Sequence, residues 1–276
     1  MSDCKKNPYA FIEAEVIKVT DETSNIKTLT LKPRGDIAFR AGQFMEVTLP
    51  GIGEAPFTPS SNHNSKETLD FTIMSAGRVT KLIHQAKAGD VVGLRGPYGT
   101  RYPLEQFKGR EVFIVGGGVG LAPLRALLYA LFNDIGDYKK IILRYGARSP
   151  GDIVYKSEID SWRRKAGNVD VGITCDVGDP SWSGHVGLVT TILSNDGLDI
   201  GNAVAIVCGP PIMMKFATFK LLDLGFKDSQ IHLSMEKNMS CGIGKCGHCR
   251  IGPYYACKDG PVFTYDKIKS LPNIWD

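Results

Sequence analysis

Four cysteines near the end of the sequence are the residues whose types and spacing most clearly indicate chemistry. Cys241, Cys246 and Cys249 form a C-x4-C-x2-C pattern, and Cys257 follows alone. This spacing is typical of plant-type [2Fe–2S] sites, in which four thiolates hold the irons. Glycines between the cysteines let the chain turn sharply, so that backbone N–H groups can point at the sulfurs. The sequence therefore predicts a [2Fe–2S] cluster with these four ligands.

A zinc site made of the same cysteines is the alternative interpretation. Zinc ribbons usually have two C-x2-C knuckles separated by a longer loop, whereas this sequence has one knuckle and a lone last cysteine. His248 lies between two of the cysteines, but no histidine follows it, so a Rieske-type ligand set is not expected. The total of seven cysteines is odd and does not suggest a disulfide framework.

Two short loops are candidates for binding a nucleotide. Gly116–Gly120 follows an apolar strand and precedes a predicted helix, where free N–H groups and the helix dipole favour a diphosphate. Its spacing departs from G-x-G-x-x-G, so a standard Rossmann fold is not the best fit. Cys208, Gly209 and Pro210 form the second loop, again after an apolar strand. Ligands of open α/β sheets bind at the carboxyl ends of strands, so Cys208 is expected to face the ligand.

The elements that position these loops fall into two kinds. Over the first hundred residues, apolar and polar side chains alternate in short runs such as 28–32, 44–49 and 69–73, which predicts half-buried strands of a small antiparallel barrel. One helix is expected there, from Val79 to about Lys87. After Gly109, apolar strands alternate with helices, which predicts a doubly wound parallel sheet. The helices are expected at 122–133, 155–165, 187–194 and 212–224.

Composition narrows the function classes. The chain of 276 residues is 43% hydrophobic and 22% charged, with a net charge of +4 spread along it, which is typical of a soluble globular protein and not of a nucleic-acid binder. Neither a secretory signal nor a spanning segment of roughly 18 apolar residues is visible, so a cytoplasmic location is expected. No Ser-His-Asp pattern or paired carboxylates suggest hydrolysis.

With these pieces in order, the chain resembles the ferredoxin-NADP reductase superfamily along nearly its whole length. More narrowly it is similar to electron-transfer subunits with a C-terminal [2Fe–2S] module, as they occur in dihydroorotate dehydrogenase, in sulfhydrogenase (the gamma subunit) and in anaerobic sulfite reductase. The motifs that carry the resemblance are Gly53–Ser61, Gly77–Leu82, Gly96–Gly99, Gly116–Pro123, Cys208–Pro211 and the four cysteines.

The resemblance implies a flavin-binding β-barrel at residues 1–106, an NAD(P)-binding α/β domain at 107–234 and the cluster module at 235–276. It also implies roles for single residues. The flavin would be lined by Phe57, Thr58 and Ser60, and its diphosphate by Gly77, Val79 and Thr80. The nicotinamide nucleotide would face Gly117, Gly118 and Gly120, with catalytic Cys208, Gly209 and Pro210 near the nicotinamide. Ala55 stands where many members of the superfamily have arginine.

The choice between NAD and NADP depends on the tip of the strand at 141–145. No acidic residue stands there to take a ribose hydroxyl, and Arg148 could meet a 2′-phosphate. This favours NADP slightly over NAD.

The predicted function is transfer of electrons between NAD(P)H, FAD and a [2Fe–2S] cluster, because a flavin can accept hydride and release electrons singly. No motif for terminal substrate chemistry is present, so a hetero-oligomer with catalytic or cluster-bearing redox subunits is expected, for example of a hydrogenase or sulfite reductase. The alternatives are a stand-alone NAD(P)H:acceptor reductase, a zinc-stabilised nucleotide-binding regulator, and a scaffold whose flavin site has decayed.

Overall fold

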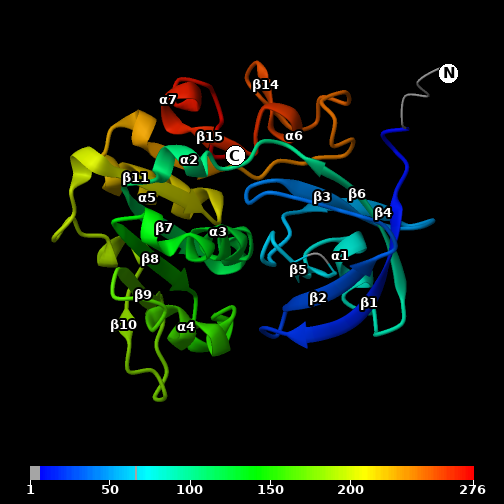
Figure 1. The fold of residues 1–276 in the computed structure, drawn as a ribbon, viewed down its shortest axis with the longest axis horizontal. Coiled ribbons are helices and arrows are strands. Elements are labelled where there is room, and N and C mark those ends of the chain that lie inside the picture. Colours follow the sequence, from blue (N-terminus) through cyan, green and yellow to red (C-terminus); the bar gives the residue numbers. More distant parts are fainter. Residues whose placement is uncertain (1–6, 66) are drawn as a thin grey trace.

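The computed structural model describes residues 7–65 and 67–276. Two sheets stand side by side, and the C-terminal residues form a small module across the top of both (Figure 1). The N-terminal sheet is the one on the right in that view. This arrangement confirms the predicted fold class, an antiparallel barrel beside a parallel α/β sheet.

The N-terminal sheet has six antiparallel strands in the order β4-β3-β6-β1-β2-β5. Their bounds are β1 Ile12–Asp21, β2 Ile26–Pro33, β3 Phe44–Leu49, β4 Gly53–Phe57, β5 Leu69–Met74 and β6 Val91–Tyr98. The alternation predicted these strands correctly, since Leu29, Leu31, Phe71 and Ile73 all lie in the core. Helix α1 (Arg78–Ile83) ends earlier than predicted, because the amides of Gln85 and Ala86 donate to carbonyls three residues back, as in a 3₁₀ turn, instead of four residues back.

The second sheet has seven strands in the order β10-β9-β8-β7-β11-β12-β15, all parallel except the last. Their bounds are β7 Glu111–Gly117, β8 Lys140–Ala147, β9 Val169–Cys175, β10 His185–Val186, β11 Ala203–Cys208, β12 Ile231–Ser234 and β15 Val262–Thr264. The helices around it are α2 Leu104–Phe107, α3 Leu121–Asn133, α4 Lys156–Arg163 and α5 Pro211–Asp223.

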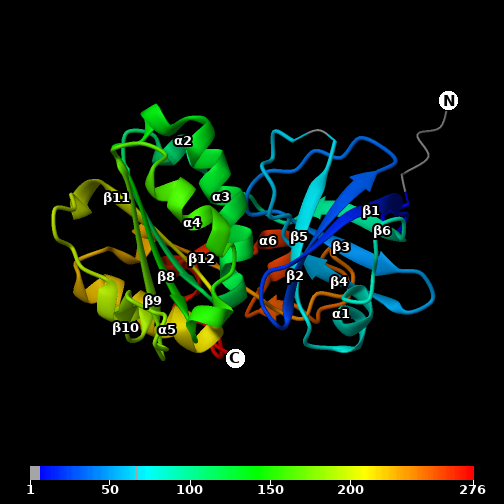
Figure 2. The ribbon, with the colours of Figure 1, turned by 90° about the horizontal axis from the view of Figure 1, so that it is seen from below.

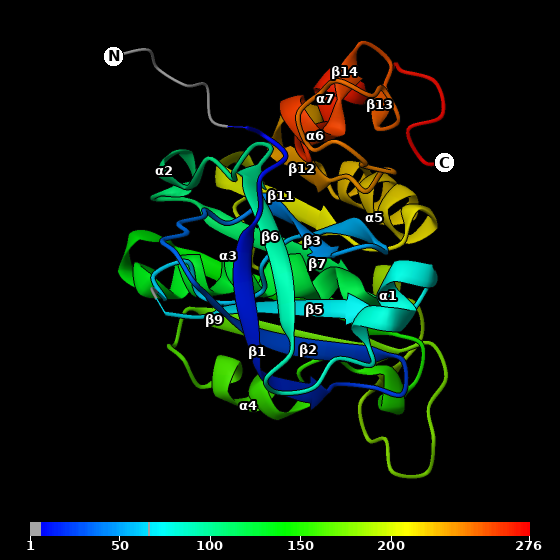
Figure 3. The ribbon, with the colours of Figure 1, turned by 90° about the vertical axis from the view of Figure 1, so that its right-hand side faces the viewer.

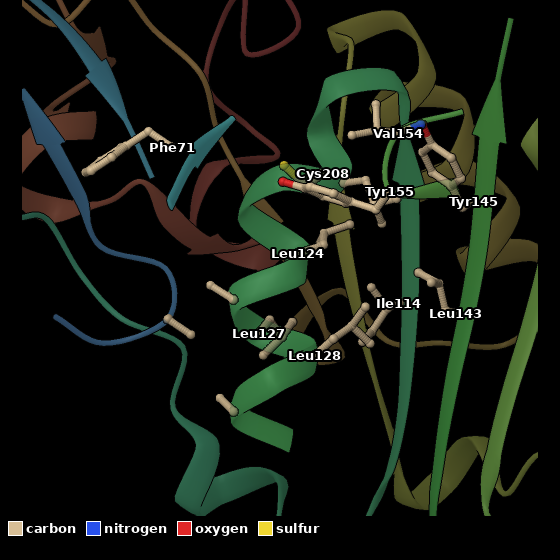
Figure 4. Packing of buried hydrophobic residues seen from close by; sticks show 14 of the residues in the cluster. Phe71, Ile114, Leu124, Leu127, Leu128, Leu143, Tyr145, Val154, Tyr155 and Cys208 are labelled. Atoms are coloured by element: carbon tan, nitrogen blue, oxygen red, sulfur yellow. The ribbon is translucent and has the colours of Figure 1, made fainter. Parts of the chain in front are cut away.

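Helices cover both faces of this sheet (Figure 2). Along β7, Ile114 belongs to the core cluster that contains α3, while its neighbour Phe113 belongs to the cluster that contains α5. Figure 4 shows the α3 side, where Leu124 and Leu128 of the helix face Ile114 of the sheet. Strands that are apolar on both faces are buried on both faces, as the doubly wound pattern requires.

The predicted helix at 187–194 is wrong. Strand β10 ends at Val186, and the chain then forms a single 3₁₀ turn, Val189–Ile192. Gly187 has φ +146°, and its carbonyl accepts a hydrogen bond of 2.6 Å from the Thr174 hydroxyl on β9, which holds the segment against the sheet edge. Four consecutive β-branched residues, at 189–192, also disfavour an α-helix.

The C-terminal module lies above β12 and α5 (Figure 3). It contains β13 (Arg250–Ile251), β14 (Tyr254–Tyr255), α6 (Ala256–Asp259) and α7 (Tyr265–Ile268). Strand β15 returns to pair antiparallel with β12. The module is thus fastened to the parallel sheet, and the Thr100 amide also donates to the Gly260 carbonyl from the barrel side.

Candidate functional site

The four cysteines at 241–257 gather in one loop, and all are free thiols. Backbone amides point at two of the sulfurs, as the glycine-rich sequence predicted. Cys241 Sγ accepts from the amides of Ile243 (3.5 Å), Lys245 (3.3 Å) and Cys246 (3.5 Å), and Cys257 Sγ accepts from that of Gly244 (3.1 Å).

The thiols at 241–257 differ in their pKa values and in their exposure. Burial opposes ionisation of Cys241, but the amide hydrogen bonds outweigh it and lower its pKa to about 6. Burial and the neighbouring Cys249 raise the pKa of Cys257 to about 12. Cys246 is exposed, whereas the other three are buried. A bound cation would favour the thiolate form throughout.

The donor set fits a metal cluster with thiolate ligands, because four cysteines lie close together at 241–257. Across the described residues, no three His, Cys, Asp or Glu side chains form a preformed group that could hold a metal ion. The amide donors fit sulfurs that carry negative charge, as cluster ligands do. The residues present therefore fit an iron–sulfur cluster.

Gly242 explains why the loop needs glycine. Its φ is +73°, and a Cβ there would lie 2.9 Å from the ring of Tyr98 on β6. A larger residue would lift the loop away from the barrel.

A cavity of about 420 Å³ opens between the two sheets, below the segment that leads into the cluster loop. All three parts of the chain line it. Phe57 and Thr58 come from the barrel, Gly120 and Cys208 come from the parallel sheet, and Met239 comes from the approach to the cysteines. This cavity is the candidate cofactor site.

Some of the residues predicted to bind a flavin line this cavity, and one contacts a lining residue from the side away from the cavity. Phe57, Thr58 and Thr80 line it. Ser60 is fully buried and bonds through its hydroxyl to that of Thr72 (3.0 Å), which itself lines the cavity. The Thr80 hydroxyl also accepts from the amides of residues 76 (2.9 Å) and 77 (2.8 Å), so it caps α1. Gly77 and Val79 are not part of the wall.

The glycine run has a packing reason as well as a binding one. Gly116 and Gly117 continue strand β7, and the helix begins only after a 3₁₀ turn at Gly118–Gly120. A Cβ on Gly120 would lie 2.6 Å from the carbonyl oxygen of Cys208, so the two predicted loops touch. Of the run, Gly120 lines the cavity, whereas Gly117 packs against Met213 and Gly118 adopts φ +52° beside open space.

Cys208, Gly209 and Pro210 all line the cavity, as predicted. Burial raises the pKa of the Cys208 thiol to about 12. Cys208 is therefore a neutral thiol near neutral pH, in the wall of the cavity.

Sequence reasoning missed several cavity residues. They are Phe44, Thr72, Met74, Ser234, Met235, Glu236, Lys237, Met239 and Pro261. Glu236 and Lys237 follow directly after the parallel strand β12. The rule that ligands bind at the carboxyl ends of strands could have identified this pair.

Arg148 lies just beyond the end of β8, exposed and outside the cavity wall. A larger cavity of about 800 Å³ lies near the other end of α3, around Arg40, Tyr102 and Ala130, and none of the predicted site residues lines it. Predicted site residues line the smaller cavity but not the larger one.

A buried polar cluster fixes the barrel against the parallel sheet. Arg125 on α3 donates to the carbonyl of Ser60 (3.1 Å), to Asp70 on β5 (3.0 Å) and to Glu158 on α4 (2.7 Å). Its guanidinium also lies 4.6 Å from the centre of the Tyr155 ring, whose hydroxyl bonds to Thr72. One arginine thus joins the barrel side of the cavity to the side formed by the parallel sheet and its helices.

The chain matches three known domain families in this order. They are the oxidoreductase FAD-binding domain over residues 13–102, the oxidoreductase NAD-binding domain over 114–218, and the iron-sulfur cluster binding domain of dihydroorotate dehydrogenase B over 236–269. Fold and site together define an oxidoreductase subunit with FAD-binding, NAD-binding and iron–sulfur domains.

Proteins of similar sequence show which kind of oxidoreductase subunit this chain is. The chain is 38% identical over 280 residues to the sulfhydrogenase 2 subunit gamma of Pyrococcus furiosus, covering 94% of this chain and 96% of the relative. It is 34% identical over 241 residues to a protein of the same organism named "Probable dihydroorotate dehydrogenase B (NAD(+)), electron transfer subunit", covering 87% and 85%. The chain belongs to this family of electron-transfer subunits.

Solved structures support the fold. The structure of the NADH-dependent reduced ferredoxin-NADP oxidoreductase matches with a TM-score of 0.72 at 23% identity, over 93% of this chain and 91% of that one. The ferredoxin reductase in carbazole 1,9a-dioxygenase matches with a TM-score of 0.69 at 26% identity, over 81% and 68%. In the part of the chain described, no helix is both long and apolar enough to span a bilayer.

Proposed function

We propose that this chain relays electrons between NAD(P)H, FAD and a [2Fe–2S] cluster and exchanges them with a partner redox subunit in the cytoplasm. The observation that carries the proposal is the single cavity lined by the barrel, by the parallel sheet and by the segment that enters the cysteine loop. Cofactors that share this cavity would lie close together, as electron transfer requires.

Each side of the cavity would hold one reactant. Phe57 and Thr58 would bind the flavin ring, while Ser60 supports them through Thr72. Gly77, Val79 and Thr80 would approach the flavin diphosphate. Because Ala55 replaces the arginine of related proteins, backbone amides near α1 would carry more of that contact.

The opposite wall would present the nicotinamide nucleotide. Gly117, Gly118 and Gly120 would lie near its diphosphate, and Gly209 and Pro210 would shape the nicotinamide end. Cys208, a buried neutral thiol, would act as the catalytic residue by positioning the ring with a hydrogen bond. Arg148 would contact a 2′-phosphate, which favours NADP over NAD. The flavin supplies the change from hydride to single electrons.

We infer the cluster type from the spacing of the cysteines. Cys241, Cys246, Cys249 and Cys257 would ligate the irons of a [2Fe–2S] cluster, in agreement with the C-x4-C-x2-C spacing. A zinc ribbon would usually have two C-x2-C knuckles, whereas this chain has one.

Anaerobic purification followed by cofactor analysis tests the proposal. We expect about one FAD, about two irons and about two sulfides per chain, with an EPR signal of a reduced [2Fe–2S] cluster after addition of NADPH. A colourless zinc protein, or a flavoprotein whose iron is not reduced by either nucleotide, would overturn it.

The partner is part of the proposal, because the relatives are named as subunits. We expect the native chain to elute from gel filtration in a complex with a redox subunit that carries further clusters or a catalytic metal. Mass spectrometry identifies that subunit. Elution of the active native chain alone would favour a stand-alone reductase instead.

A further inference from the structure

Arg95 on β6 is a buried cation at the contact between the barrel and the cysteine loop. Only 2% of its side chain is exposed. Its Nη1 donates to the carbonyl of Cys241 (3.0 Å) and to the hydroxyl of Tyr98 (3.0 Å). Its Nε and Nη2 form a two-point contact with the carboxylate of Glu54 on β4. One guanidinium thus joins two barrel strands to the backbone of a proposed cluster ligand.

The barrel surface beneath the cysteine loop is closed to solvent. Glu46 on β3 is fully buried, and neither of its carboxylate oxygens has a hydrogen-bond partner among the described residues. A Cβ on Gly242 would lie 3.5 Å from Glu46 Oε1 and 2.9 Å from the Tyr98 ring. Burial, together with the Glu54 carboxylate, raises the pKa of Glu46 to about 8. Such a buried site strengthens the field of any charge beside it.

We propose that Arg95 is a positioning residue for the iron–sulfur site, which holds Cys241 against the barrel and raises the reduction potential of the cluster. Reduction adds an electron to the cluster, and a nearby buried cation favours that added negative charge. Glu54 opposes the effect because its carboxylate balances part of the guanidinium charge. The proposal rests on the proposed function, since it needs a cluster at these cysteines.

Substitutions of Arg95 and of Glu54 should shift the reduction potential of the cluster in opposite directions. Replacing Arg95 with methionine removes the cation and leaves Glu54 unbalanced, so the cluster becomes harder to reduce. The Glu54→Gln variant keeps the cation and removes its counter-ion, so the cluster becomes easier to reduce. A residue with only a structural role would not reverse the sign between these variants.

The test is an EPR-monitored redox titration of the full-length holoprotein in its native complex. For Arg95→Met we expect about a tenfold loss in the reduction equilibrium at a fixed potential, which is a shift of about 59 mV to lower potential for one electron. For Glu54→Gln we expect a smaller shift to higher potential, because this carboxylate is 27% exposed. Arg95→Lys keeps the positive charge but not the two-point contact with the Glu54 carboxylate. Its reduction potential should lie between those of Arg95→Met and the wild type.

Arg34→Met is the matched control, since Arg34 forms an exposed pair with Glu13 elsewhere on the barrel and should leave the potential unchanged. If Arg95→Met fails to fold or to hold iron, Glu54→Gln and Arg95→Lys decide the question. Shifts in the same direction for Arg95→Met and Glu54→Gln, or no shift in Glu54→Gln, would overturn the proposal. A missing [2Fe–2S] signal in the wild type would instead show that the proposed function has failed.

Discussion

Replacing Arg125 with methionine should destabilise the whole chain, because this side chain joins the two sheets. Only 11% of it is exposed, and it makes ion pairs with both Asp70 and Glu158. Methionine keeps much of the apolar length of the side chain but removes all of the N–H donors. The carboxylates of Asp70 and Glu158 then remain at the contact between the two sheets without their cation.

The size of the effect follows from burial. Removing one partner of a buried ion pair costs about 3–5 kcal/mol. Asp70 and Glu158 are 20% and 27% exposed, so water stabilises them in part after the change. The contact of the guanidinium with the Tyr155 ring, at 4.6 Å, is lost as well. Together these effects predict a loss of about 3 kcal/mol in the free energy of unfolding.

Urea unfolding of the full chain, followed by tryptophan fluorescence, measures this loss. Trp162 is buried beside Tyr155, with ring centres 6.3 Å apart, and so reports on this region. Arg34→Met is the control and should cost no more than about 1 kcal/mol, since its ion pair is exposed. A cost for Arg125→Met within about 1 kcal/mol of that control would refute the role assigned to the polar cluster.

Three further predictions follow from other residues. Burial lowers the pKa of His232 to about 4, below its unfolded value of 6.5, so the unfolded state binds a proton that the folded state does not. About 3 kcal/mol of stability present above pH 6.5 should therefore be lost as the pH falls towards 4. Urea unfolding across this range should show a smaller dependence of stability on pH for His232→Leu than for the wild type. Arg148→Ala should raise the KM for NADPH roughly tenfold and leave that for NADH unchanged in steady-state assays, whereas equal changes would exclude contact with a 2′-phosphate. In the cluster-free protein at pH 8, iodoacetamide should modify exposed Cys246 and spare Cys208, whose pKa of about 12 keeps it a thiol; peptide mass spectrometry that finds Cys208 modified first would contradict this.

The sequence predicted most reliably what depends on neighbours along the chain. Alternation identified the barrel strands, and the C-x4-C-x2-C spacing placed four thiols in one loop with amides directed at them. Where local pattern and tertiary contact disagreed, the prediction failed. The segment 187–194 has helical spacing, but the hydrogen bond from Thr174 to the Gly187 carbonyl ties it to a strand that lies earlier in the chain.

The cavity residues show the same limit. Gly120 and Cys208 could be placed at strand ends from sequence alone, because parallel strands align their carboxyl ends. That Arg125 would reach Asp70 and Glu158 could not be predicted, because these partners are 55 and 33 residues away and no periodic pattern records them.

Glu46 shows how a failure of the local sequence pattern can point to a contact with a distant part of the chain. In an alternating strand its side chain should face solvent, opposite Met45 and Val47, and yet it is fully buried. The conflict arises because the cysteine loop, almost two hundred residues later, covers that face of the barrel. A buried carboxyl without a partner is costly, and it remains only where other contacts hold the loop in place. Arg95 supplies such a contact through the Cys241 carbonyl. Glu46, a buried carboxylate at a position expected to face solvent, therefore marks the surface where the barrel meets the proposed cluster.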